Sequence, residues 1–151
     1  MTRRMRNPAT LLPGALDALH ALGVATRESG VSPRTIGLVQ LRASQINGCV
    51  VTMDSHMRML EAAGETTERL AALRHWSTSD LFTAAERSAL ALSEAVSRAA
   101  DQDDPVPDAV WDEAARHYDQ VRLAGLLLAI ATTNLWNRLN VATRQGVGAW
   151  D

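Results

Sequence analysis

The feature that most constrains the fold is a long apolar run near the C-terminus. From Val121 to Trp136 the sequence is almost entirely apolar, with Arg122 as its only charge. At about 16 residues the run is shorter than the roughly 20 that a helix needs to cross a bilayer. A helix that is apolar on every face has to be covered by other protein. The run therefore predicts a central core helix, or a helix covered by a second subunit.

The rest of the chain also has helical periodicity, and strand-type alternation is nowhere sustained. Apolar residues recur at helical spacing over residues 11–22, with Gly23 as the expected stop. Ser32-Pro33 predicts the start of a helix that ends at Asn47-Gly48. These patterns predict an all-α fold of about six to eight helices.

Helix-start and linker patterns later in the chain also predict a helical architecture. Thr83 to Glu86 has the pattern of a capping box, which opens a helix. The acidic, proline-containing residues 101–108 predict a linker within the domain, with Asp108 capping the next helix. The whole chain, residues 1–151, is expected to form a single domain, with residues 1–10 as a loose tail.

Composition excludes several classes of function. The formal net charge is -2 at pH 7, and no basic face is visible, which argues against nucleic-acid and membrane binding. The four histidines have no zinc-like spacing, and no phosphate-binding loop is present, so we expect no metal and no cofactor. A single cysteine cannot form an internal disulfide, and the basic N-terminus lacks a signal-peptide core, so we expect a cytoplasmic protein.

The only cysteine, Cys49, lies at a predicted boundary between two helices. If the second helix begins near Cys49, then Cys49, Thr52 and His56 share one face of it. A thiol at a helix N-terminus lies beside unpaired N–H groups, which favour the reactive thiolate form. The alternative stays open, because a lone cysteine is more often a buried apolar residue.

Two further residues are candidates for the wall of a pocket. Met53 is close to Cys49, and Trp76 ends a short helix expected over residues 67–76. Methionine adapts its shape to a ligand, and tryptophan offers a large apolar surface. Both residue types are more often core filler at such positions, and that interpretation is also left open.

The residues around Cys49 resemble the signature of a known family. The stretch from Leu38 to Cys49, followed by Met53 to His56, is similar to the signature block of the carboxymuconolactone decarboxylase and alkylhydroperoxidase D-like (AhpD-like) superfamily. Residues 76–87 and 134–138 also look like that family. The resemblance implies a small all-helical subunit in a homo-oligomer of three or six copies, with the cysteine stretch lining a pocket near a subunit contact.

The same resemblance implies that two of the four functional side chains of the signature are absent here. In the peroxidase branch of the family, a glutamate, a pair of cysteines and a histidine form a thiol pair with a proton relay. The corresponding positions here are Gly37, Cys49, Thr52 and His56. The family mechanism gives the attack to the second cysteine, and Thr52 can neither attack as a thiolate nor form a disulfide.

The missing glutamate has three candidate substitutes. Gly37 cannot carry a proton, and Gln40, one turn later, can form hydrogen bonds but cannot titrate. Asp54 could titrate, and a residue from a neighbouring subunit could reach the site. The sequence does not choose among them.

Three functions follow from these residues. The first is a thiol-dependent peroxidase in which Cys49 attacks a small-molecule hydroperoxide, His56 polarises or deprotonates it, and an external thiol resolves the sulfenic acid. The second is a lyase or isomerase on a small cyclic acid, with His56 as general acid or base and Cys49 as part of the wall. The third is a non-catalytic oligomer that keeps the pocket as a ligand sensor or partner-binding module.

Overall fold

The computed structural model describes residues 2–149, and these residues form helices joined by loops and turns. The α-helices are α1 (Ala15–Arg27), α2 (Pro33–Ile46), α3 (Val50–Ala62), α4 (Thr67–Ala72), α5 (Ala84–Ser97), α6 (Asp108–His117) and α7 (Gln120–Thr143). Short 3-10 helices are η1 (Pro8–Thr10), η2 (Leu73–Thr78) and η3 (Ala99–Asp101). The predicted all-α fold is confirmed for the described residues, and seven α-helices fall within the expected number.

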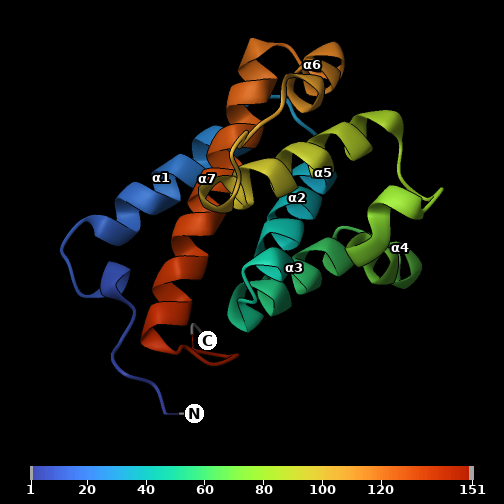
Figure 1. Ribbon diagram of the computed structural model, residues 1–151. Coiled ribbons are helices and arrows are strands. Elements are labelled where there is room, and N and C mark those ends of the chain that lie inside the picture. The colour runs from blue at the N-terminus through green and yellow to red at the C-terminus, as the bar shows by residue number, and fades with distance from the viewer. Residues whose placement is uncertain (1, 150–151) are drawn as a thin grey trace.

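Helix α2 lies at the centre of the arrangement, with α3, α5 and α7 packed against it (Figure 1). The helix begins at Ser32-Pro33 as predicted, because proline at the first helical position lacks an N–H that would have no helical partner there. The helix buries an apolar stripe at Ile36, Val39 and Ala43. Residues on other sides of α2 are buried as well, which leaves the helix covered nearly all round.

Two clusters of buried side chains meet at α2. The first cluster consists of Val31, Ile36, Val39, Ala89, Leu92, Ala114, Tyr118, Leu123, Leu126, Ala129 and Ile130. The second cluster consists of Leu38, Leu41, Leu60, Leu70, Leu73, Phe82 and Leu90. Because α2 contributes to both, it joins the α5–α6–α7 side of the molecule to the α3–α4 side.

Helix α7 contains the whole apolar run and continues past it to Thr143. One side of α7 is core, as predicted, and Leu126, Ala129 and Ile130 are fully buried there. Another side carries Leu128 and Leu135, which are 42% and 40% exposed. Within one chain, other residues therefore cover only one side of this apolar run. Within residues 2–149, no helix combines the length and the apolar character that a membrane span requires.

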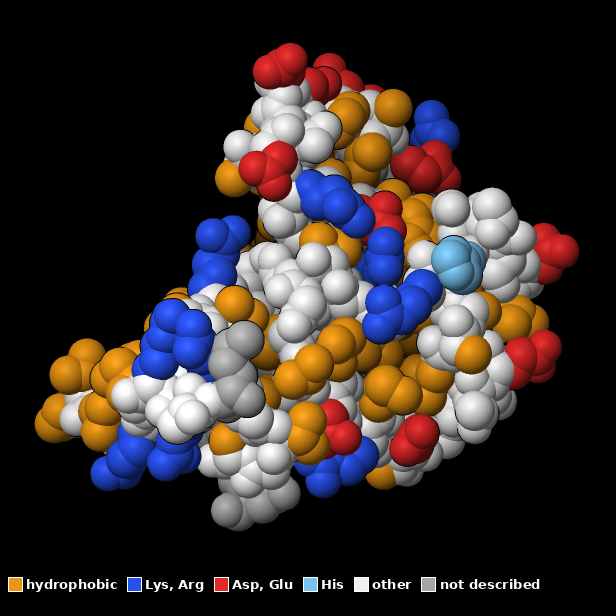
Figure 2. Space-filling model, turned by 60° about the horizontal axis from the view of Figure 1, so that its bottom comes forward, with side chains coloured by type: hydrophobic (Ala, Val, Ile, Leu, Met, Phe, Trp, Pro, Cys, Tyr) orange, Lys and Arg blue, Asp and Glu red, His pale blue; other side chains and the backbone are white. Residues whose placement is uncertain are grey.

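Helix α1 is also rich in apolar residues that the single chain leaves uncovered. Thr26 is its one buried residue among those described, while Leu22 and Val24 are 39% and 43% exposed. The space-filling view shows hydrophobic side chains at the surface over much of one face, between groups of arginine and acidic side chains (Figure 2). The single chain thus leaves apolar side chains of α1 exposed to solvent.

The short helix expected over residues 67–76 is divided: α4 ends at Ala72, and the 3-10 helix η2 continues past Trp76 to Thr78.

Three other local predictions were wrong. The first helix begins at Ala15, because Pro13-Gly14 precedes it and Gly14 has a φ of 80°. It then runs through Gly23, since a single glycine weakens a helix without stopping it. Asp108 is the first helical residue of α6 and Pro107 takes the cap position, so the linker ends one residue earlier than expected.

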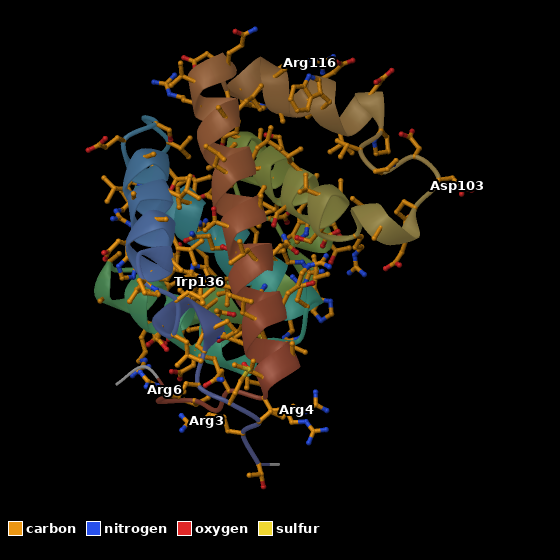
Figure 3. All side chains as sticks on the ribbon, turned by 90° about the vertical axis from the view of Figure 1, so that its left-hand side faces the viewer. Arg3, Arg4, Arg6, Asp103, Arg116 and Trp136 are labelled. Atoms are coloured by element: carbon orange, nitrogen blue, oxygen red, sulfur yellow. The ribbon has the colours of Figure 1, made fainter. Side chains whose placement is uncertain are left out.

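The N-terminal segment is anchored, which corrects the loose tail expected for residues 1–10. Met1 lies outside the described residues. The Arg4 N–H donates to the carbonyl oxygen of Thr143 at 2.9 Å, and the Asn7 side chain is buried against Asn140. In the side view, Arg3, Arg4 and Arg6 lie near the lower end of α7 (Figure 3). The segment is held because its polar groups satisfy backbone and amide groups at the end of α7.

Candidate functional site

Cys49 is held by a tight turn between α2 and α3. Gly48 has a φ of 64°, a left-handed conformation that glycine adopts without a Cβ clash. The N–H of Gly48 donates to the Gln45 carbonyl and the N–H of Cys49 donates to the Ser44 carbonyl, which closes α2 with a Schellman turn. Cys49 is the N-cap residue of α3 and is 2% exposed. The predicted helix boundary is confirmed, and the cysteine is buried at it.

Thr52, one turn after Cys49, is tied to α7. Its hydroxyl donates to Asn137 Oδ1 at 2.6 Å, a shorter contact than the 3.2 Å between the same hydroxyl and the Cys49 carbonyl oxygen. Asn137 Oδ1 also lies 3.3 Å from Ser44 Oγ. Asn137 is fully buried, and its Nδ2 has no hydrogen-bond partner among the described residues. The position that resembles a second cysteine therefore holds a hydrogen bond between α3 and α7.

His56 lies on α3, two turns after Cys49. The residue is half-buried, and its Nδ1 is buried without a partner among the described residues. Burial lowers the pKa of the imidazole from 6.5 to about 4, so His56 is neutral at pH 7. Seven residues of helix separate the two Cα atoms by about 10 Å along the axis. In the described chain no hydrogen bond joins the Cys49 thiol to the imidazole, and Thr52 lies between them in the sequence.

Gly37 lies on α2 directly against Leu60 of α3. A Cβ atom at this position would be 2.7 Å from Leu60 Cδ2 and 3.1 Å from Leu60 Cγ. Leu60 is 2% exposed and belongs to the second cluster. The space above Gly37 is therefore filled by a leucine side chain, and a glutamate could not enter it unless Leu60 moved.

The remaining candidates lie in different surroundings. Gln40 is half-buried on α2, and its carbonyl accepts a hydrogen bond from Ser44 Oγ at 2.9 Å. Met53 and Trp76 both pack against the second cluster. Trp76 also lines a hollow of about 380 Å³ formed with residues of α5 and α6, and Cys49 does not line that hollow. These contacts fit the packing interpretation of Met53 and Trp76.

A charged network holds Trp76 in place. The indole Nε1 donates to Glu94 Oε1 at 2.9 Å, and the same oxygen accepts from Arg42 Nε at 2.7 Å. Arg42 also donates to Gln45 Oε1 at 3.1 Å, one residue before the end of α2. Arg87 lies over the indole ring, 5.6 Å from its centroid. The network joins α2, η2 and α5 beside the turn that carries Cys49.

Sequence reasoning missed a row of buried asparagines on α7. Asn134, Asn137 and Asn140 recur at every third residue and are at most 8% exposed. Asn134 Oδ1 accepts from Asn47 Nδ2 at 2.8 Å, and Asn140 Oδ1 accepts from Asn7 Nδ2 at the same distance. The signal available in the sequence was the recurrence of three amides at helical spacing near an apolar run. Buried polar side chains are usually hydrogen-bonded, so these amides were candidates for contacts with other segments.

Comparison with protein families gives one match that covers the site. The model of the carboxymuconolactone decarboxylase family matches residues 12–95, more than half of the chain and including Cys49, Thr52 and His56. YdfG of Bacillus subtilis, an uncharacterised protein, is 33% identical over 132 residues, which are 87% of this chain and 88% of YdfG. YnjA of Escherichia coli, also uncharacterised, is 32% identical over 117 residues, which are 77% of this chain and 62% of YnjA.

Solved structures share the fold. The crystal structure of ATU0492 from Agrobacterium tumefaciens, a protein of unknown function and candidate antioxidant defence protein AhpD, superposes with a TM-score of 0.88. It is 30% identical, and the alignment covers 97% of this chain and 98% of that one. The debrominase Bmp8 without ligand has a TM-score of 0.79 at 21% identity, covering 89% of this chain and 72% of that one. The second likeness concerns the fold alone.

The close approach of Gly37 and Leu60 predicts a non-additive pair of substitutions. Gly37→Ala should lower the free energy of unfolding by about 1–3 kcal/mol, because its methyl group displaces Leu60 in a packed core. In a Leu60→Ala background the same change should cost less, since the space has been vacated. Urea unfolding of the four proteins measures this. Gly146→Ala, where a Cβ meets nothing within 4 Å, is the control. Additive changes would show that the two side chains do not compete for space.

The buried Nδ1 of His56 predicts that the protein is sensitive to acid. Its pKa is about 4 in the folded protein and near 6.5 in the unfolded chain, so above pH 6.5 both states are neutral. Between these values the unfolded chain binds a proton that the folded protein excludes, and stability falls with falling pH by at most about 3 kcal/mol. Urea unfolding at pH 7 and pH 5 measures the loss. His56→Gln should remove this part of the pH dependence and the exposed His20→Gln should keep it; an unchanged profile in His56→Gln would contradict the assignment.

Proposed function

We propose, since this chain belongs to the carboxymuconolactone decarboxylase family, that it is a single-cysteine thiol oxidoreductase of the AhpD-like type that reduces organic hydroperoxides. The observation that carries the proposal is the position of Cys49 as the N-cap of α3, with Thr52 and His56 following at spacings of three and seven on the same helix. Sulfur, hydroxyl and imidazole are thereby carried by one rigid element, which fixes their relative positions.

In the proposed reaction the Cys49 thiolate attacks the terminal oxygen of the hydroperoxide. The O–O bond breaks, the sulfur becomes a sulfenic acid, and the alkoxide takes a proton and leaves as an alcohol. One external thiol then displaces water from the sulfenic acid to form a mixed disulfide. A second external thiol displaces the Cys49 thiolate and leaves with the first as a disulfide. Both reducing thiols come from other molecules, because Thr52 cannot form a disulfide.

His56 acts in this scheme as a neutral hydrogen-bonding group. With a pKa of about 4 it is too weak a base to hold the proton of the thiol at neutral pH. It can still orient the hydroperoxide, since a neutral imidazole both donates and accepts. Of the candidate substitutes for the glutamate, Asp54 is paired with Arg58 at 2.7 Å, which leaves Gln40 or a neighbouring subunit as the polar contributor.

The remaining elements of the proposal concern the surroundings of the protein. A homo-oligomer of three or six subunits is supported by the uncovered apolar residues of α1 and α7. An external thiol reductant implies a reducing compartment, for which the cytoplasm is the proposed location. The substrate is a small molecule, since the site lies between helices rather than on an extended surface.

The first test is the intact mass of the protein after one equivalent of an organic hydroperoxide, with a sulfenic-acid trap present. The wild type should gain one trap adduct per chain, and Cys49→Ser should gain none, because the chain has no other cysteine. His56→Ala should slow trapping at least tenfold, since the hydroperoxide loses its orienting contact. A wild-type thiol that stays unmodified when the folded protein is treated would overturn the redox proposal.

A second candidate function is favoured by one observation. Among the described residues, neither the buried His56 Nδ1 nor the buried Asn137 Nδ2 has a hydrogen-bond partner. Both residues are near Thr52, one by helical spacing and the other by a hydrogen bond. Such atoms are usually paired, so a small polar ligand is a suitable occupant. The candidate is a site for a small cyclic acid, with lyase or isomerase chemistry at His56 or with binding alone.

Thermal unfolding with a panel of small cyclic carboxylic acids tests the second candidate. A bound carboxylate favours the imidazolium form of His56, so the rise in Tm should be larger at pH 5.5 than at pH 7.5. Asn137→Leu should abolish the rise, and His20→Gln should preserve it. Product formation by the wild type but not by His56→Ala would distinguish catalysis from binding. If no acid raises Tm at either pH, this candidate fails.

A further inference from the structure

The side of α7 that faces away from the core carries a regular apolar stripe. Val121, Ala124, Leu128, Ala131 and Leu135 follow one another at alternating spacings of three and four, and all five are exposed. Val121 is 66% exposed. The stripe spans about 21 Å along the helix, at 1.5 Å per residue. Its period of 3.5 residues is that of a seam along which two helices pack.

The stripe alternates in size as well as in spacing. The larger residues Val121, Leu128 and Leu135 occupy one set of seam positions, and Ala124 and Ala131 occupy the other. When two copies of such a helix pack antiparallel about a two-fold axis, each position of one set faces a position of the other set. Leu128 then lies opposite Ala131 of the second copy, and Leu135 lies opposite Ala124. In a parallel pair, leucine would face leucine and alanine would face alanine, which leaves gaps.

We propose that the α7 stripe is a two-fold contact between copies of this chain, in which α7 packs antiparallel against α7 of a second copy. The same patch serves both partners, as an isologous contact requires. The two-fold axis passes between Leu128 and Ala131. The inference rests on the homo-oligomer of the proposed function and requires its six-subunit form, because a closed trimer has no two-fold axis. It adds the surface, the orientation and the pairing of residues.

Charge supports a second copy as the occupant. The five stripe residues carry no charge, so the stripe lacks the basic groups by which nucleic acid or an anionic lipid surface is recognised. Arg138 continues the spacing at one end of the stripe and would face Val121 of the second copy, at the rim of the contact. An uncharged centre with charge at the rim is typical of interfaces between protein subunits.

The contact would also enclose a hollow that one hydrogen bond connects to the turn carrying Cys49. A hollow of about 450 Å³ lies beside the stripe, lined by Val96, Ala131, Asn134, Leu135, Arg138 and Leu139. Asn134 is hydrogen-bonded to Asn47, in the turn that carries Cys49. In the side view α7 runs down the middle of the molecule with α1 beside it (Figure 3). A second α7 across the stripe would cover this hollow and leave α1 accessible for a further subunit contact.

Sedimentation equilibrium of the wild type, Leu128→Glu and Val141→Glu tests the contact. The wild type should be oligomeric at micromolar concentration. Leu128→Glu should raise the dissociation constant of the two-fold contact at least a hundredfold, because it places two charges at the axis. Val141 is 52% exposed on the same helix but outside the stripe, so Val141→Glu should keep the wild-type mass. Far-ultraviolet circular dichroism establishes that all three proteins are folded.

A size swap tests the antiparallel pairing itself. Leu128→Ala alone should weaken association at least tenfold, since it leaves alanine opposite alanine. Leu128→Ala combined with Ala131→Leu should restore it, because the two residues face each other across the axis. An unchanged mass in Leu128→Glu would overturn the stripe contact while leaving the homo-oligomer in place. A monomeric wild type would overturn both, and failure of the swap to restore association would overturn the pairing. Sulfenic-acid trapping at Cys49 is measured separately. Its result supports or contradicts the redox proposal whatever the oligomeric state.

Discussion

The close packing of α2 against three other helices is the constraint on which the rest of the structure depends. A helix covered on almost every side has to carry small residues where a neighbouring side chain packs onto its backbone, and Gly37 is such a residue against Leu60 of α3. The Gly37–Leu60 contact is thus one of the contacts that hold α3 against α2. The turn at Gly48 then places Cys49 at the start of α3.

The same packing explains why the candidate site differs from the redox pattern that it resembles. Leu60 fills the space beside Gly37, and the hydroxyl of Thr52 donates a hydrogen bond to Asn137. Gly37 is therefore part of the packed core, and Thr52 is part of the contact between α3 and α7. Cys49 and His56 keep their places on α3, but the imidazole is neutral because it is buried. Chemistry at this site has to proceed with one sulfur and an uncharged imidazole.

Different sides of helix α7 have three different surroundings. One side supplies Leu126 and Ile130 to the first cluster, and the asparagine row ties the helix to the α2–α3 turn and to the N-terminal segment. The exposed side holds the stripe centred on Leu128. A helix that reads as uniformly apolar in the sequence is thus part core, part polar junction and part exposed apolar surface.

The sequence by itself determined the helical fold, most helix boundaries and the placement of Cys49, Thr52 and His56 on one helix. These features are local: proline and glycine punctuation, capping patterns and helical periodicity act within a few residues of chain. Only the tertiary structure decided that Leu60 fills the space above Gly37 and that Asn137 accepts a hydrogen bond from the Thr52 hydroxyl. It also decided that Nδ1 of His56 is buried. Each of these depends on side chains far apart in sequence meeting at a packed contact, and local patterns carry no information about which distant residue fills a given volume.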